Sequence, residues 1–184
     1  MKRLFTLLIA LTAMSVTLEA QEAPKKYGIK SGNAKTETEM MGQKMISMSW
    51  FDDYGALEAS KTEMNGMEIT TLFRDGKTYA IIPSMKRMQE MPTQESINYL
   101  NLTDEVVEKN KIKEVGKETI LGKECTTYSL EVSQMGQTAK MTVSVWEGYP
   151  MKAITDAMGS VITVKVLEFT EGPVDPSLFE LPNY

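Results

Sequence analysis

Apolar and polar residues alternate with a period of two over most of this chain, and that period constrains the fold more than any other feature. In 46–50, the apolar residues Ile46, Met48 and Trp50 are separated by two serines, and 161–169 is the longest run rich in β-branched residues. Successive side chains of a β-strand point to opposite faces of a sheet, so such runs predict strands with one buried face. Further strands are expected at 69–73, 78–82, 125–132 and 138–146.

Turn sequences separate these strands at short intervals. Asn65-Gly66 and Asp75-Gly76 are residue pairs that favour the tight type I′ turn between antiparallel strands. Looser turns are expected at 121–123 and 158–160, and 133–137 is expected to join 125–132 to 138–146 as a hairpin. Regular strands joined in this way predict a mainly β fold built as an antiparallel meander.

One segment interrupts the alternation. Residues 93–111 follow Pro92 and contain two threonines, Thr93 and Thr103, that are each followed by acidic residues and can cap a helix. We therefore expect one or two short helices here, packed on one face of the sheet. The apolar residues available for that packing are Ile97, Leu100, Leu102, Val106 and Val107. Near the C-terminus, 174–179 is expected to form a single capped turn that begins at Pro176 and points Phe179 inward.

The first twenty residues have the composition of a secretory signal. Lys2 and Arg3 precede an uncharged, mainly apolar run over 4–16, and Ala20 provides a small residue for cleavage. The run is shorter than the roughly 20 apolar residues that span a bilayer. We therefore expect a cleaved signal peptide at 1–20 and a location in the periplasm or outside the cell.

The remaining 21–184 has the length of a single antiparallel β-rich domain. Without Lys2, Arg3 and Glu19 it carries 18 cations and 24 anions, a net charge of −6. This balance argues against nucleic acid or anionic lipid headgroups as partners, because both recruit clustered Lys and Arg. No second apolar run is long enough to form a membrane span.

Cys125 is the single cysteine of the chain. It has no intramolecular partner for a disulfide, and we expect no disulfide-linked partner chain. No cysteine follows the signal run, so no thiol is placed there for lipid attachment, and the product is expected to be soluble. Cys125 itself is expected to act as a small apolar core residue.

The residues offer little for catalysis. The chain contains no histidine, which removes the commonest general base, the commonest zinc ligand and every Ser-His-Asp or Cys-His arrangement. Asp52 and Asp53 are adjacent and point to opposite faces of a strand, whereas Glu37 and Glu39 share a face that we interpret as a solvated edge. The glycines lie singly at turns and form no phosphate loop. We expect no enzyme activity and no cofactor.

Methionine is unusually abundant, with 15 in the chain and 13 after residue 20. Clusters such as Met85, Met88 and Met91 could bind Cu(I) through their thioethers if they lie in a loop or helix. Flexible methionines could instead line an adaptable apolar cavity, or simply fill the core. On a strand, a spacing of three places two side chains on opposite faces, so we expect no metal site.

Three segments resemble the periplasmic lipoprotein-carrier superfamily (LolA/LolB-like) and related secreted bacterial families of unknown function. They are 116–128 (GKETILGKECTTY), 146–152 (WEGYPMK) and the closing 173–182 (PVDPSLFELP). The resemblance implies a curved antiparallel sheet that forms a half-barrel, with one or two short helices as a lid and an apolar space between them.

Two functions remain open from the sequence. The first is a carrier or binding protein for a lipidic or apolar ligand, with a role in lipid or lipoprotein trafficking and a lipoprotein as one possible cargo. The second is an envelope structural or protein-interaction module. For the carrier, the candidate residues lining a cavity between the concave sheet face and the 93–111 lid are Met48, Trp50, Phe73, Tyr79, Ile81, Met88 and Trp146.

Overall fold

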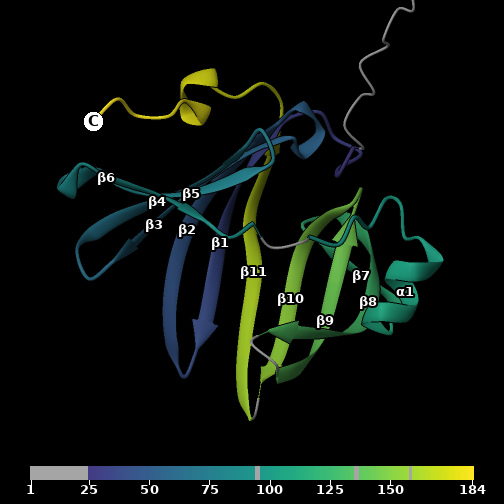
Figure 1. Cartoon of the computed structure of the whole chain (residues 1–184). Coiled ribbons are helices and arrows are strands. Elements are labelled where there is room, and N and C mark those ends of the chain that lie inside the picture. The colour runs from purple at the N-terminus through teal and green to yellow at the C-terminus, as the bar shows by residue number, and fades with distance from the viewer. Residues whose placement is uncertain (1–24, 94–95, 135–136, 158) are drawn as a thin grey trace, which may run out of the picture.

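The computed structural model describes residues 25–93, 96–134, 137–157 and 159–184, and it contains eleven antiparallel strands in one open sheet (Figure 1). The first six strands are β1 (Gly32–Met40), β2 (Gln43–Asp52), β3 (Leu57–Met64), β4 (Met67–Arg74), β5 (Lys77–Ile82) and β6 (Arg87–Met91). The other five are β7 (Lys113–Ile120), β8 (Lys123–Gln134), β9 (Gln137–Trp146), β10 (Tyr149–Ala157) and β11 (Ser160–Glu171). The predicted signal peptide at 1–20 lies outside the described residues.

The strand order divides the sheet into two halves that meet at a single long-range pairing. Across the sheet the order is β6-β5-β4-β3-β2-β1-β11-β10-β9-β8-β7. Within the first half (β1–β6) and the second half (β7–β11), each strand pairs with its neighbour in sequence, as a meander requires. Because β1 pairs with β11, strands near the two ends of the described chain lie at the centre of the sheet, and β6 and β7 form its edges.

Local sequence explains the tight connections. Asn65-Gly66 and Asp75-Gly76 have positive φ at both positions, with values of 51° and 74° and of 52° and 73°. These values fit the predicted type I′ turns, which match the twist of the paired strands. The turn at Leu121-Gly122 is tighter than the sequence predicts, because its φ values of 51° and 76° and the pairing of Ile120 with Lys123 give the same two-residue turn.

The segment predicted as one or two helices contains one, α1 (Asp104–Asn110). Thr103 caps it as expected, since its hydroxyl accepts a hydrogen bond from the backbone N–H of Val106. Residues 96–103 are not helical, so within the predicted helical segment 93–111 the structure has a helix only at 104–110. Their turn is fixed by Asn98, whose side chain donates to the carbonyl of Lys25 and accepts from the N–H of Leu100. These hydrogen bonds replace those that a helix would make.

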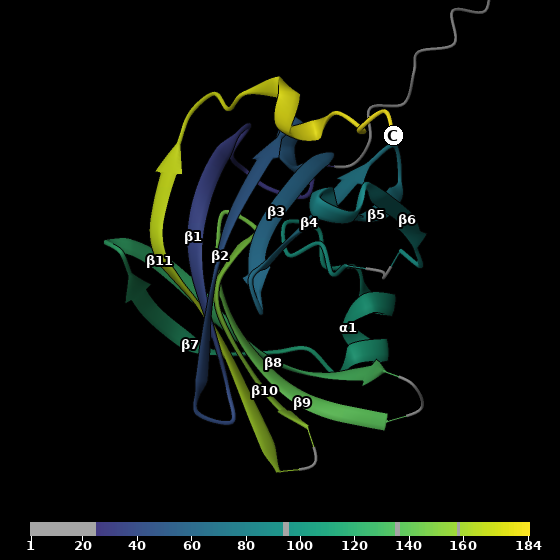
Figure 2. The ribbon, with the colours of Figure 1, turned by 90° about the vertical axis from the view of Figure 1, so that its left-hand side faces the viewer.

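The sheet is strongly curved and leaves one side open, which gives the predicted half-barrel (Figure 2). We define the inner face as the one on which α1 packs, and the outer face as the opposite one. The inner face can be followed across the sheet through directly paired residues. Val143 of β9 pairs with Ala153 of β10, and Ala153 pairs with Val164 of β11. Val164 pairs with Thr38 of β1, so the inner face continues into the first half.

In the first half, the main apolar cluster lies on the outer face. Trp50 of β2 pairs with Ala59 of β3, and Ala59 pairs with Leu72 of β4. The C-terminal segment covers them through the 3-10 helix η3 (Pro176–Phe179), which agrees with the predicted single capped turn. Phe179 is only 3% exposed. The cluster on this outer face consists of Ala59, Leu72, Ile81 and Phe179, with Trp50, Leu57, Tyr79, Val174 and Leu178 packed against it.

In the second half, the apolar side chains lie on the inner face, under α1. The buried residues there are Ile112, Leu130, Val143 and Val145. Val106 and Val107 of α1 pack against them, together with Ile97, Tyr99, Leu102 and other partly buried residues. A third cluster joins the two halves and includes Tyr27, Phe51, Tyr149 and the fully buried Cys125.

Some sequence interpretations of single residues need correction. Glu37 and Glu39 do not lie on an edge: they belong to the central strand β1, and their carboxylates contact Lys44 on the outer face. The Met85–Met91 region is neither loop nor helix throughout, because the short 3-10 helix η2 (Pro83–Met85) is followed by β6. Met88 and Met91 therefore point to opposite faces of a strand. Among the described residues, the one α-helix has seven residues, too few to cross a membrane.

Candidate binding site

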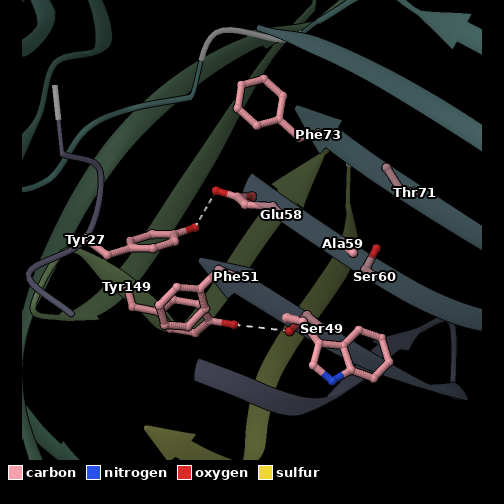
Figure 3. A pocket seen from close by; sticks show the side chains of 10 residues that line it. Tyr27, Ser49, Phe51, Glu58, Ala59, Ser60, Thr71, Phe73 and Tyr149 are labelled. Atoms are coloured by element: carbon pink, nitrogen blue, oxygen red, sulfur yellow. Dashed lines mark hydrogen bonds between the residues drawn. The ribbon is translucent and has the colours of Figure 1, made fainter. Parts of the chain in front are cut away.

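A small pocket lies on the inner face of the first half, next to the cluster that joins the two halves (Figure 3). Its volume is about 120 Å³. The residues that line it come from the N-terminal segment, from β2, β3 and β4, and from the start of β10. They are Tyr27, Ser49, Trp50, Phe51, Glu58, Ala59, Ser60, Thr71, Phe73 and Tyr149. Pockets that enclose a drug-sized ligand measure about 300–1,000 Å³, so this one has room for a single ring-sized group.

Backbone hydrogen bonds to both halves of the sheet place Tyr27. Its N–H donates to the carbonyl of Tyr54, which belongs to η1 (Asp53–Gly55) in the first half. The next N–H, of Gly28, donates to the carbonyl of Glu147 in the β9–β10 turn. Gly55 has a φ of 89°, and a Cβ there would lie 2.8 Å from the Tyr27 ring. Glycine at this turn therefore allows the tyrosine to close the end of the half-barrel.

Aromatic rings form one wall of the pocket. The ring centroids of Tyr27 and Phe51 are 5.0 Å apart and those of Tyr27 and Tyr149 are 5.1 Å apart, both in edge-to-face geometry. Such contacts hold rings in fixed orientations. Phe73, from β4, is half-buried and lies on the opposite side of Glu58 from Phe51, because the three residues are direct cross-strand neighbours.

Glu58 is the charged group of the pocket. Its Oε1 accepts hydrogen bonds from Nζ of Lys26 at 2.5 Å and from the hydroxyl of Tyr27 at 3.0 Å. Burial raises the pKa of Tyr27 well above its ordinary value, and the nearby Glu58 carboxylate adds to this shift. The phenol therefore stays protonated and donates. Among the described residues no donor contacts the other oxygen, Oε2.

The floor of the pocket carries a row of hydroxyl groups. Ser49, Ser60 and Thr71 are direct cross-strand neighbours on β2, β3 and β4. The Ser49 hydroxyl lies 3.3 Å from that of Tyr149, and burial raises the pKa of Tyr149, which remains a neutral phenol. Ser60 and Thr71 make no side-chain hydrogen bond to the part of the chain that the structure describes. Their hydroxyls therefore remain available to solvent or to a ligand.

Beyond the pocket, the inner face continues towards the centre of the sheet without a tight cover. Helix α1 packs on the second half, and the side chains in between are neither buried nor fully exposed. In a close-packed core they would be buried. These half-buried positions are Thr36, Thr38, Met45, Ser47, Thr62, Ile69, Ile162 and Val164.

The sequence-predicted cavity residues are distributed over both faces. Phe73 lies on the inner face and lines the pocket, and Trp50 also borders it. Met48, Tyr79, Ile81 and Met88 follow the outer-face register of Trp50 and Leu72, and Tyr79 and Ile81 pack with the C-terminal cluster. Trp146 is half-buried and contacts Phe169 in edge-to-face geometry. Nζ of Lys123 lies 3.5 Å from the centroid of the Trp146 ring. The part that these side chains take in ligand binding stays a prediction.

Sequence reasoning missed Tyr27, Glu58 and Tyr149. Tyr27 precedes the first strand and belongs to no alternating run, so it reaches the pocket only through its contacts with two distant turns. Glu58 lies on the inner face of β3, whereas the apolar cluster of this strand lies on the outer face. A search for alternating apolar residues therefore does not indicate Glu58. The signal that could have found this site is the repeated Ser and Thr on the alternate positions of neighbouring strands.

A second hollow, of about 390 Å³, borders Lys152 and Lys165 between β7, β10 and β11. Nζ of Lys152 already contacts both carboxylate oxygens of Glu118, which also accepts a hydrogen bond from Ser144. The aliphatic lining of this second hollow includes Leu121, which is 49% exposed, and no aromatic side chain lines it among the described residues. The inner pocket is therefore the better-built candidate.

The arrangement in the inner pocket suits binding. A neutral tyrosine, a carboxylate paired with lysine and two free hydroxyls can orient a ligand, but they include no activated nucleophile. Cys125 is fully buried, and burial raises the pKa of its thiol. Within the described ranges, no three His, Cys, Asp or Glu side chains lie close enough to hold a metal ion together.

Comparison with known proteins identifies the fold. No family model and no curated protein sequence matches the chain. The structure of the Pseudomonas aeruginosa MucA/MucB complex matches 80% of this chain at 12% identity with a TM-score of 0.55, and this chain spans about half (54%) of the matched chain. An uncharacterised conserved protein from Thermus thermophilus matches 83% of this chain and 86% of its own, at 11% identity and a TM-score of 0.56.

A putative outer membrane lipoprotein-sorting protein domain from Vibrio parahaemolyticus also matches 82% of this chain and 89% of its own, at 11% identity, with a TM-score of 0.38. Together, the matches above a TM-score of 0.5 show that the half-barrel is a fold found in other proteins, including one that is known in a protein complex.

Proposed function

We propose that residues 21–184 form an exported, non-catalytic protein that binds a single lipidic or apolar molecule in the hollow of the half-barrel. The observation that carries this proposal is the half-exposed inner face, which runs from the aromatic pocket to the apolar wall under α1. A sheet of eleven strands offers more inner surface than one seven-residue helix covers.

The small pocket and the open inner face beyond it bind different parts of the ligand. The pocket takes one ring-sized group, and the rest of a longer ligand lies on the inner face towards Ile162 and Val164. Removing apolar ligand surface from water contributes about 25 cal/mol per Å². A ligand of this kind is carried without covalent chemistry, in the periplasm or outside the cell, after removal of 1–20.

Fluorescence of N-phenyl-1-naphthylamine, a neutral apolar probe, tests the proposal on the purified protein. We expect its emission to rise on binding and to fall when unlabelled dodecyl-chain amphiphiles compete. Thr71→Phe places a ring in the pocket from an exposed position, so it should weaken binding by at least tenfold with little change in stability. The matched control is Thr163→Phe, which adds the same ring to the outer face of β11.

An absence of probe binding to the wild type would refute the proposal. Equal weakening by both phenylalanine variants would also contradict it, because the effect would then not come from the inner face. N-terminal sequencing of the exported protein tests the location, with a start at or near Gln21 expected.

A protein-interaction role is the second candidate, and one observation favours it. All five residues of the edge strand β6 are exposed, and its outer backbone groups have no strand partner among the described residues. MucB, which shares the fold, is known in a complex with MucA(peri). Native mass spectrometry of protein purified from its own envelope separates the two candidates: a lipid mass supports the carrier, and an associated protein supports the interaction module.

A further inference from the structure

The polar groups of the inner pocket have a pattern that the proposed function does not require. A site for a plain hydrocarbon chain would be lined by apolar side chains. Here, two adjacent strands carry three polar groups that face the pocket and have no hydrogen-bond partner within the described part of the chain. They are Oε2 of Glu58 and the hydroxyls of Ser60 and Thr71.

The spacing of these groups follows from the sheet. Ser60 and Thr71 are directly opposite each other, and Glu58 lies two residues from Ser60 on the same face of β3. Neighbouring strands are about 4.8 Å apart, and alternate residues of one strand are about 6.7 Å apart. The three groups therefore form a triangle with sides of roughly 5–8 Å, which is the size of one polyhydroxylated ring or glyceryl unit.

The aromatic rings complete the pattern. Phe51 and Phe73 flank Glu58 on the neighbouring strands, and Tyr27 closes the end of the pocket. Carbon-bound hydrogens of a sugar or glyceryl group pack on such rings, while its hydroxyls donate to the carboxylate and exchange hydrogen bonds with Ser60 and Thr71.

Charge decides against an acidic headgroup. Lys26, beside the pocket, is already paired with Glu58 through Oε1. Among the described residues, the lining of the pocket contains no Lys or Arg. A carboxylate or phosphate entering the pocket would meet the Glu58 charge and would have only hydroxyls as donors. Burying an unpaired charge is strongly unfavourable.

We propose that the ligand is an amphiphile with a neutral, hydroxyl-bearing headgroup, and that this headgroup occupies the pocket formed by Glu58, Ser60, Thr71 and the surrounding rings. The apolar chain then lies on the inner face towards α1. This inference rests on the proposed binding function and specifies its ligand class.

Isothermal titration with four probes that share a dodecyl chain tests the headgroup. They are dodecyl glucoside, dodecanol, dodecanoate and dodecyl phosphate, with dodecanol used below its solubility limit and the others below their critical micelle concentrations. We expect dodecyl glucoside to bind about tenfold more tightly than dodecanoate or dodecyl phosphate, because two or three net hydrogen bonds distinguish it. In saturation-transfer NMR, the sugar protons should receive at least as much saturation as the chain.

The variant Ser60→Ala/Thr71→Val removes both free hydroxyls and keeps the shape of the pocket. It should reduce the preference for dodecyl glucoside over dodecanol to less than threefold. Thr142→Val, which removes a hydroxyl from the outer face of β9, is the control. Ser60→Thr/Thr71→Val keeps one of the two hydroxyls and should retain part of the preference.

The outcomes separate the two proposals. Equal affinity for all four probes, or a preference that survives Ser60→Ala/Thr71→Val, would overturn the headgroup inference and leave the apolar-binding function intact. Tighter binding of dodecanoate or dodecyl phosphate would also overturn it. If no dodecyl probe binds, the proposed function itself fails.

Discussion

The two halves of the sheet bury opposite faces. In the first half, the apolar side chains point outward and are covered by the C-terminal segment around Phe179. In the second half, they point inward and are covered by α1. The switch occurs at the pairing of β1 with β11, where the cluster containing Phe51 and Tyr149 joins both halves.

This difference explains where the hollow lies. Each half receives one covering element, and each element lies on the apolar face of its own half. The inner face of the first half carries mainly Ser and Thr, with Glu58, Met45, Ile69 and the rings of Phe51 and Phe73 between them. Among the described residues, no segment packs tightly on it. A hollow with hydroxyl groups therefore faces an apolar wall across the half-barrel, an arrangement suited to an amphiphilic ligand.

The largest effect that tests the comparison is expected at Phe179. This side chain is 3% exposed and fills the outer-face cluster of the first half. Phe179→Ala should lower the free energy of unfolding by about 3–5 kcal/mol, as large-to-small changes in protein cores do. Urea denaturation measures it, with Leu181→Ala as the control because Leu181 is 39% exposed. A loss below about 1 kcal/mol would show that the C-terminal segment is not a structural cover.

A pair of inner-face substitutions compares the halves directly. Leu130 is 3% exposed beneath α1, and Leu130→Ala should cost about 2–5 kcal/mol of stability. Ser60 occupies the inner face of the first half, and Ser60→Ala should change stability by about 0.5 kcal/mol or less. Thermal and urea unfolding measure both variants. Similar losses at the two positions would mean that the inner face of the first half is also packed.

The cover over the second half depends on a helix cap. The Thr103 hydroxyl accepts from the N–H of Val106 at 3.4 Å. Thr103→Ala should destabilise the fold by about 1 kcal/mol, and hydrogen exchange should become faster in 104–110 but stay unchanged in the strands of the first half. Thr103→Ser keeps the hydroxyl and should restore protection. Faster hydrogen exchange in both halves would contradict the view that α1 and the C-terminal segment cover the two halves independently.

The smallest expected effect concerns the outer face of the second half and depends on pH. A hydrogen bond from Ser144 is the main cause that lowers the pKa of Glu118, and Lys152 adds to it while partial burial opposes it. A carboxylate with a lowered pKa in the folded state stabilises the fold above its unfolded pKa, and this contribution is lost as pH falls through the folded value.

Glu118→Gln should therefore reduce the melting temperature slightly at pH 7 and less at about pH 3, below the ordinary carboxyl range. The control is Glu124→Gln, which removes the exposed partner of Lys117. A difference that stays constant between the two pH values would show that ionisation of Glu118 does not contribute.

The sequence by itself determined six of the eleven strands, the position of the one described α-helix and most of the local connections. Alternation placed β2, β4, β5, β8, β9 and β11, and Asn65-Gly66, Asp75-Gly76, the Thr103 cap and the turn at Pro176 act through contacts a few residues apart. Such features depend on backbone geometry and nearby side chains, so they can be read from neighbouring residues. The extended segments β1 and β6 were harder to predict, because their residues are largely polar or exposed.

Only the tertiary structure decided which face of each strand lines the hollow. Period two places Tyr79 and Ile81 on one face of their strand, but it contains no information on whether that face is inner or outer. That choice depends on the curvature of the sheet and on the packing of distant segments, namely α1 and the C-terminal turn. The pocket around Tyr27 and Glu58 likewise arises because the N-terminal segment bonds to turns of both halves, which are far away in sequence.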